Sequence, residues 1–239
     1  MTIALQSVLR IRGALTTAGD GGTAQLPIEE GLAKSVANGT GLDQANGLYI
    51  DDFSIAASGS LNIDLSGSLE LATKKYDLMQ GVNVRGTFLL SRSAIPVLKD
   101  AENPHILSLS PPLNPTPKWL GAHTGYTLAK FGMTMVTLGL AAEFARDGIA
   151  ANTLWPRTTI ATAAVQNLLG GDRVMAASRT PDIYADAAYA VLCKPAAEYT
   201  GQTLIVEDVL EESGVTDLSG YAAVPGTPDD RLFPDIFLD

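Results

Sequence analysis

The chain has 239 residues, of which 46% are hydrophobic and 18% are charged, a composition typical of one folded domain. Its formal net charge of −10 argues against nucleic acid or an anionic membrane surface as a partner. A single cysteine and two histidines exclude a disulfide framework and leave too few ligands for a zinc site, so we expect no metal. No apolar run reaches the roughly 18 residues of a membrane span. With no signal peptide recognised, we expect a cytoplasmic protein.

Residues 1–67 show little regular patterning and are rich in Gly, Ala and Thr. One helix is predicted near 27–37 and one strand near 48–56. The string GDGGTA (19–24) follows an apolar stretch and formally fits the G-x-G-x-x-A pattern of a dinucleotide-binding turn. A helix should begin inside such a motif, but TAQLP intervenes and the next helix begins at Pro27. An ordinary glycine-rich loop is therefore the favoured interpretation.

A regular alternation of apolar strands and helices begins at residue 68 and continues to about residue 210. Apolar periodicity predicts helices at 68–101, 124–147, 159–169, 171–178 and 181–193. Short apolar runs predict strands at 105–110, 149–155 and 201–207. Together with the strand near 48–56, this order indicates a parallel sheet with helices on both faces. Residues 211–239 are predicted to form an irregular acidic tail that lies on the domain.

The stretch HTGYTLAKFGM (123–133) places a tyrosine and a lysine four residues apart. In a helix, Tyr126 and Lys130 would share one face. An unperturbed phenol has a pKa near 10, and a neighbouring ammonium lowers it towards the range useful for general acid–base catalysis. Such a pair is more often ordinary surface packing, so the chemical interpretation depends on what surrounds it.

With YTLAKFGM itself, the chain contains five ordered segments, of which the others are YDLMQGVNVRGTFL, HILSLSPPLN, NTLWPRTTIATAAVQNLLGG and DAAYAVLCKP. Together they resemble the short-chain dehydrogenase/reductase family, and more closely its hydroxysteroid dehydrogenase-like branch. The match runs from about residue 68 onward, about 70% of the chain. The resemblance implies one Rossmann-like α/β domain over residues 1–239, with a doubly wound parallel sheet in three layers. It also implies NAD or NADP as the cofactor, a small alcohol or carbonyl compound as the substrate, and assembly as a homodimer or homotetramer.

The same resemblance assigns roles to individual residues. Tyr126 would be the acid/base, and Lys130 would lower its pKa and contact the cofactor ribose. Asn83 matches the asparagine that holds a water in a proton relay to the lysine. A helix-bend role for Asn83, in which its side chain bonds a backbone carbonyl, is compatible with that relay. The segment that lines the nicotinamide would include Pro156, Thr158 and Thr159.

Two positions depart from the family pattern. The family serine stands thirteen residues before the tyrosine, where this chain has Leu113. A loop longer by about three residues moves the candidate to Ser110, which would orient the substrate carbonyl. A strict alignment of the strand instead places Pro111 there, and Ser108 points the same way from deeper in the strand. Arg157 replaces a usual glycine and would meet a cofactor phosphate, a substrate carboxylate or only solvent.

The cofactor-binding half departs further. The family string T-G-x-x-x-G-x-G is absent from the sequence, and SIAAS (54–58) stands where relatives have N-N-A-G or N-N-A-S. Measured back from the matching region, the N-terminal part is roughly 40 residues short, which predicts that the first βαβ unit is missing. Three interpretations remain: a working NAD(P)-dependent oxidoreductase acting on a partly apolar alcohol or carbonyl, a folded homologue that binds no dinucleotide and acts as an interaction protein, or the product of an altered reading frame.

Overall fold

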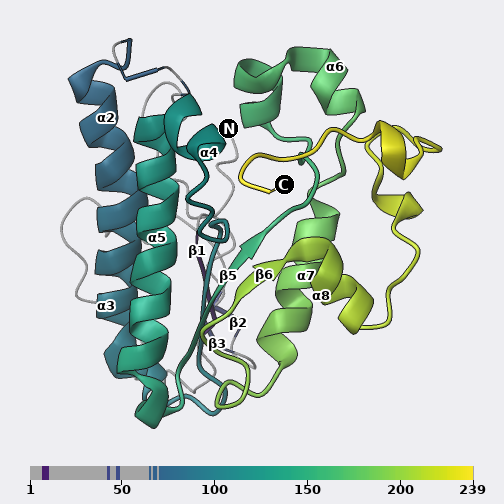
Figure 1. Ribbon diagram of the computed structural model, residues 1–239. Coiled ribbons are helices and arrows are strands. Elements are labelled where there is room, and N and C mark those ends of the chain that lie inside the picture. Colours follow the sequence, from purple (N-terminus) through teal and green to yellow (C-terminus); the bar gives the residue numbers. More distant parts are fainter. Residues whose placement is uncertain are drawn as a thin grey trace.

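The computed structural model describes residues 7–10, 42–43, 47–48, 65, 67–68 and 70–238. Its main sheet, of which β1, β5 and β6 are labelled in Figure 1, has the strand order β1-β4-β5-β6. β4 (His105–Ser108), β5 (Ala150–Trp155) and β6 (Thr203–Ile205) are parallel to one another. β1 (Ser7–Arg10) pairs antiparallel with β4 at the edge. Among the described residues, no parallel strand precedes β4.

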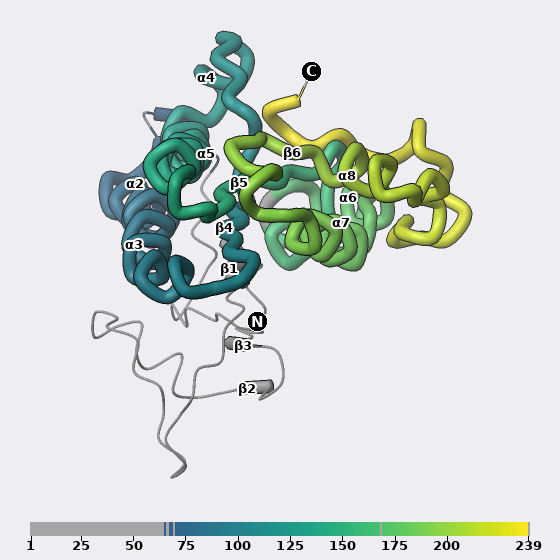
Figure 2. Tube along the Cα trace, turned by 90° about the horizontal axis from the view of Figure 1, so that it is seen from below, coloured from purple at the N-terminus to yellow at the C-terminus, as the bar shows by residue number. Residues whose placement is uncertain are grey.

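Helices cover both faces of this sheet, as the view in Figure 2 makes plain. One layer contains α2 (Thr73–Gln80), α3 (Gly86–Leu98) and α5 (Thr124–Glu143). The opposite layer contains α7 (Asp182–Cys193) and α8 (Val206–Glu212), with α6 (Gly171–Ala176) beside them. Short α4 (Pro117–Ala122) precedes α5. The predicted three-layer α/β fold is therefore confirmed. No helix of the described part is long and apolar enough to cross a bilayer.

Two hydrophobic cores arise because successive residues of a strand point to opposite faces. Ile106 of β4 packs into the layer of α3 and α5, where Leu98 is fully buried. The next residue, Leu107, packs into the layer of α7 and α8, against residues such as Ile183 and Val191. A strand buried on both sides favours apolar residues at successive positions, as Ile106 and Leu107 show.

The long predicted helices are confirmed, with one addition. The stretch predicted as helical over 68–101 consists of α2 and α3, joined by a π-helical turn at Gly81–Arg85. The helix predicted over 124–147 is α5 followed by a 3₁₀ turn, and it ends at Gly148, whose φ of 71° is left-handed. The predicted strands at 105–110 and 149–155 are β4 and β5, each slightly shorter than expected.

The strand predicted over 201–207 is wrong in its last part. β6 ends at Ile205, and α8 begins at Val206 because Val206, Val209 and Leu210 have helical spacing and bury one face in the core. The tail therefore starts later than predicted. α4 was also missed, since its residues were interpreted as loop.

Of the strand expected at 48–56, the structure describes only Leu48, which is not part of the main sheet. Residues Gly47–Leu48 form β3, which pairs antiparallel with β2 (Leu42–Asp43). Only three residues separate the two strands, and so short a connection permits antiparallel but not parallel pairing. Residues 49–64, the predicted helix at 27–37 and the GDGGTA string lie outside the described residues.

Candidate active site

Tyr126 and Lys130 lie together on α5 at the carboxyl ends of β4 and β5. Both side chains are buried, and the Lys130 Nζ lies 6.0 Å from the centre of the Tyr126 ring. The same Nζ donates a hydrogen bond to the carbonyl oxygen of Leu109, just beyond β4, at 3.0 Å. It also lies 5.3 Å from the Trp155 ring at the end of β5. Open parallel sheets bind their ligands at this edge.

Close packing of α5 against the π-helical turn sets the position of this pair. A Cβ atom on Gly132 would lie only 2.7 Å from the Cγ2 of Val84, so this position has room for glycine alone. In the same turn Asn83 is buried, and its Nδ2 donates to the Met79 carbonyl at 2.9 Å, the helix-bend role considered above. Its Oδ1 is buried and has no hydrogen-bond partner within the part of the chain that the structure describes. Buried polar atoms of this kind commonly bind an ordered water.

The electrostatics of the pair differ from expectation. Burial raises the pKa of Tyr126 well above its ordinary value, and the nearby Asp235 carboxylate raises it further. The predicted lowering of that pKa by Lys130 is therefore outweighed in this arrangement. Burial also lowers the pKa of Lys130 to about 8, although Asp235 acts in the opposite direction. Tyr126 is thus protonated at neutral pH, which is the state that a proton donor requires.

Ser110 is bonded to a different turn of α5 from the one that carries Tyr126. Its hydroxyl is fully buried and accepts a hydrogen bond from Thr134 Oγ1 at 2.9 Å. Thr134 follows Tyr126 by eight residues, which is about 12 Å along a helix. The Ser108 hydroxyl likewise accepts a hydrogen bond from Thr137 Oγ1 at 2.8 Å, about one turn further along α5.

Asn114 is linked to Tyr126 through Phe237. Its Nδ2 donates at 3.1 Å to the carbonyl of Phe237, whose ring stacks on Tyr126. Asn114 precedes Tyr126 by twelve residues, close to the family spacing of thirteen for the serine. That spacing was the signal in the sequence that could have identified it.

The segment expected to line the nicotinamide is held by protein contacts. Glu207 of α8 accepts the Arg157 amide proton at 2.8 Å and the Thr158 hydroxyl proton at 3.4 Å. Thr159 is buried, and its hydroxyl bonds the Ser178 hydroxyl at 2.7 Å. The Arg157 guanidinium forms an exposed ion pair with Asp208, which favours the surface interpretation of that arginine. Glu207, which sequence reasoning missed, therefore fixes the backbone that follows Pro156.

Residues 233–238, which we call the tail segment, return across the molecule to the candidate site (Figure 1). Phe237 is buried among four aromatic rings at centroid distances of 5.2–6.1 Å: Trp119, Tyr126, Phe131 and Trp155. Its φ of 74° is unfavourable for a bulky residue. Such strain costs about 1–3 kcal/mol and persists only where surrounding contacts offset it, as burial of an aromatic ring does here. The predicted tail on the domain is thus specifically docked.

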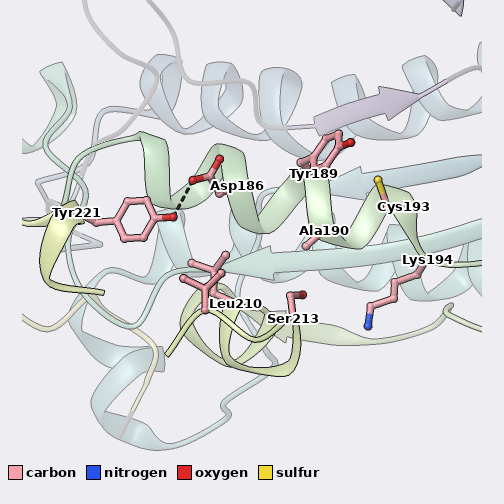
Figure 3. Close-up of a pocket in the computed structure, with 9 residues that line it drawn as sticks. Asp186, Tyr189, Ala190, Cys193, Lys194, Leu210, Ser213 and Tyr221 are labelled. Carbon is pink, nitrogen blue, oxygen red and sulfur yellow. Dashed lines mark hydrogen bonds between the residues drawn. The ribbon is translucent and has the colours of Figure 1, made fainter. Parts of the chain in front are cut away.

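A separate shallow hollow of about 430 Å³ lies between α7 and α8 (Figure 3). Its lining includes Tyr189, Cys193, Leu210 and Tyr221. The Tyr221 hydroxyl donates to Asp186 at 2.7 Å. None of the predicted site residues lines this hollow, so it is distinct from the candidate active site.

The comparisons with known proteins agree with this geometry. A family model described as enoyl-(acyl carrier protein) reductase matches residues 51–208, well over half of the chain. The chain belongs to the short-chain dehydrogenase/reductase family.

Its similarity is strong to proteins named hydroxysteroid dehydrogenase-like protein 2, with 50% identity over 185 residues for the one from Danio rerio and 49% for the one from Xenopus tropicalis. These matches cover 77% of this chain but only 43% of each relative, so the chain spans less than half the length of these curated relatives. A solved structure of a short-chain dehydrogenase from Mycobacterium thermoresistibile is 58% identical. It superposes with a TM-score of 0.67, covering 74% of this chain and 61% of that one.

Proposed function

We propose that this chain is an NAD(P)-dependent oxidoreductase that interconverts a partly apolar alcohol and its carbonyl compound. The observation that carries the proposal is the placement of Tyr126 and Lys130, buried side by side at the carboxyl ends of β4 and β5. Family membership supports the reaction class. Titration with a dinucleotide separates this function from that of a folded homologue that binds no dinucleotide.

The residues present suit the nicotinamide end of a dinucleotide. The Lys130 ammonium carries three protons, of which the Leu109 carbonyl takes one, so others remain for the ribose hydroxyls. The orphaned Oδ1 of Asn83 suits a relay water. The segment from Pro156 to Thr159 would lie along the nicotinamide ring. NAD or NADP would supply or accept the hydride when bound.

Each residue then has a defined task. In the direction of reduction, the Tyr126 hydroxyl donates its proton to the carbonyl oxygen of the substrate, which becomes the alcohol. The Lys130 ammonium stabilises the phenolate that this leaves. Ser110, as the family resemblance implies, or Asn114, which bonds the carbonyl of Phe237, would hold the carbonyl oxygen of the substrate in position. A proton returns to Tyr126 along the route from Lys130 and the Asn83 water.

The decisive experiment has two parts. Titration of the purified protein with NADH and NADPH, followed by nicotinamide fluorescence, tests whether either dinucleotide binds. In a carbonyl-reduction assay, Tyr126→Phe should lower turnover by a factor on the order of 10² to 10⁴, because it removes the general acid. Dinucleotide binding should survive this substitution.

Tyr199→Phe is the matched control. The Tyr199 hydroxyl bonds Glu212 at the surface, away from α5, so its loss should leave turnover unchanged. A parent protein that binds neither dinucleotide, with no difference between parent and Tyr126→Phe, would support the non-enzyme interpretation instead.

We also propose that the chain assembles with copies of itself through the layer of α3 and α5. Large apolar side chains are exposed on these helices, among them Phe88, Leu128 and Met135. Exposed apolar patches of this kind mark interaction surfaces.

A further inference from the structure

The tail segment is tied to several separate parts of the candidate site. Its hydrogen bonds are Thr159 N to Phe233 O (2.8 Å), Phe233 N to Ala177 O (2.7 Å), Asp235 N to Arg157 O (3.0 Å), Trp155 Nε1 to Ile236 O (3.0 Å) and Asn114 Nδ2 to Phe237 O (3.1 Å). The partners belong to the loop after β4, to β5, to the segment that follows β5 and to the end of α6. A segment bonded from so many directions has one docked position.

The two phenylalanines of the tail segment differ sharply. The Phe237 ring is 1% exposed and stacks on the Tyr126 ring, with centroids 6.1 Å apart and planes 20° apart. The Phe233 ring, four residues earlier, is 45% exposed. Of these two rings, therefore, only that of Phe237 limits how the Tyr126 side chain can move and how much water reaches it.

We propose that Phe237 is a positioning residue for Tyr126 and that the tail segment is a fixed wall of the substrate site. This inference rests on the function proposed above and adds to it a residue far along the chain from the Tyr126–Lys130 pair. The substrate reaches the Tyr126 hydroxyl past the tail segment and not across the ring face that Phe237 covers. Ring stacking holds the hydroxyl in register with the carbonyl, and exclusion of water keeps the phenol protonated.

The two tryptophans of the chain report directly on this arrangement. Trp119 and Trp155 each lie 5.9 Å from the Phe237 ring, and the chain has no other tryptophan. In Phe237→Ala, water should reach both indoles, so emission moves to longer wavelength and acrylamide quenches it more strongly. Phe233→Ala removes an equal ring from the same segment and should leave emission unchanged.

The second readout is the titration of the phenol. Ultraviolet absorbance at alkaline pH, compared between chains with and without Tyr126→Phe, isolates the ionisation of Tyr126. Because burial is the main cause that raises this pKa, Phe237→Ala should lower it, whereas Phe233→Ala should not. Turnover of Phe237→Ala should fall on the order of 10- to 100-fold through loss of alignment, with dinucleotide affinity unchanged.

The outcomes separate cleanly. Equal emission and equal phenol titration in Phe237→Ala and Phe233→Ala would overturn the proposal. The proposal would also be overturned if NAD⁺ made the tryptophan emission of the parent resemble that of Phe237→Ala, with longer wavelength and stronger acrylamide quenching. The tail segment would then be a moving lid and not a fixed wall. Should Phe237→Ala not fold, Phe237→Leu keeps the apolar volume without the ring and should show the same changes in smaller size. Absence of dinucleotide binding by the parent would defeat the proposed function alone, because emission and titration need no cofactor.

Discussion

Asp235 allows a thermodynamic test of how the tail segment is held. Its carboxyl group interacts electrostatically with four titratable side chains: Tyr126 and Lys130 of α5, Tyr184 of α7 and Glu207 of α8. Burial is the main cause that raises the pKa of Asp235 from 3.8 to about 7. The amide of Ile236 and the Lys130 ammonium oppose this rise, and the Glu207 carboxylate adds to it. The docked tail segment therefore favours a neutral Asp235.

An acid whose pKa is higher in the folded than in the unfolded chain favours folding at low pH. For Asp235 this contribution is complete below about pH 4, declines as the pH rises, and is lost above about pH 7. A difference of about three pH units corresponds to at most about 4 kcal/mol. Asp235 is partly exposed, and water screens its charge, so we expect roughly half of that, about 2 kcal/mol.

Urea-induced unfolding of the parent and of Asp235→Asn, at about pH 4 and about pH 8, measures this quantity. Asparagine keeps the oxygen that accepts the Ile236 amide proton at 2.7 Å but does not ionise. We expect similar stability at the lower pH and a variant more stable by about 2 kcal/mol at the higher pH. Asp230→Asn changes the same charge at an exposed position of the tail and should alter stability by less than about 0.5 kcal/mol at either pH. A stability difference for Asp235→Asn that is the same at both pH values, or a variant less stable at the higher pH, would refute the reasoning.

Two further predictions concern α5. Lys130→Met should weaken NADH binding and move the pH optimum of turnover upward, as measured by fluorescence titration and a pH–rate profile; unchanged affinity would contradict the role of Lys130. Burial lowers the pKa of Lys130 to about 8, so the folded chain disfavours the ammonium charge below that pH. The free energy of unfolding of the variant, measured in urea near pH 7, should therefore be little lower than that of the parent. Met135→Glu places a charge where the side chain is 63% exposed and should convert an oligomer to a monomer of 25.0 kDa in sedimentation; a monomeric parent would exclude the assembly.

The elements that the sequence predicted well are those with local signals. α5 has sustained apolar periodicity and a left-handed glycine, Gly148, at its end. β4 and β5 are short, buried strands, and a proline follows each of them within three residues. Tyr126 and Lys130 could be placed on one face because the helical repeat alone fixes that relation.

The parts that were missed depend on contacts between distant residues. The loop after Ser110 was predicted to be irregular but contains α4, whose position depends on its packing against α5. The strand at 201–207 ended early because Val206 onward packs as a helix on α7. Phe237 stands in an acidic, irregular stretch, and no local pattern indicates that its ring stacks on Tyr126, more than 100 residues away.

The direction of catalysis follows from the charge state of Tyr126. Removal of a proton from an alcohol needs the phenolate, whereas reduction of a carbonyl needs the protonated phenol. Phe237, which excludes water, and Asp235, which adds negative charge when ionised, both act to keep the phenol protonated. The Lys130 ammonium opposes them, but burial holds its own pKa near 8, so its influence fades above that pH. Under the function proposed above, this charge state would favour carbonyl reduction at neutral pH, and the tail segment would contribute to that preference together with α5.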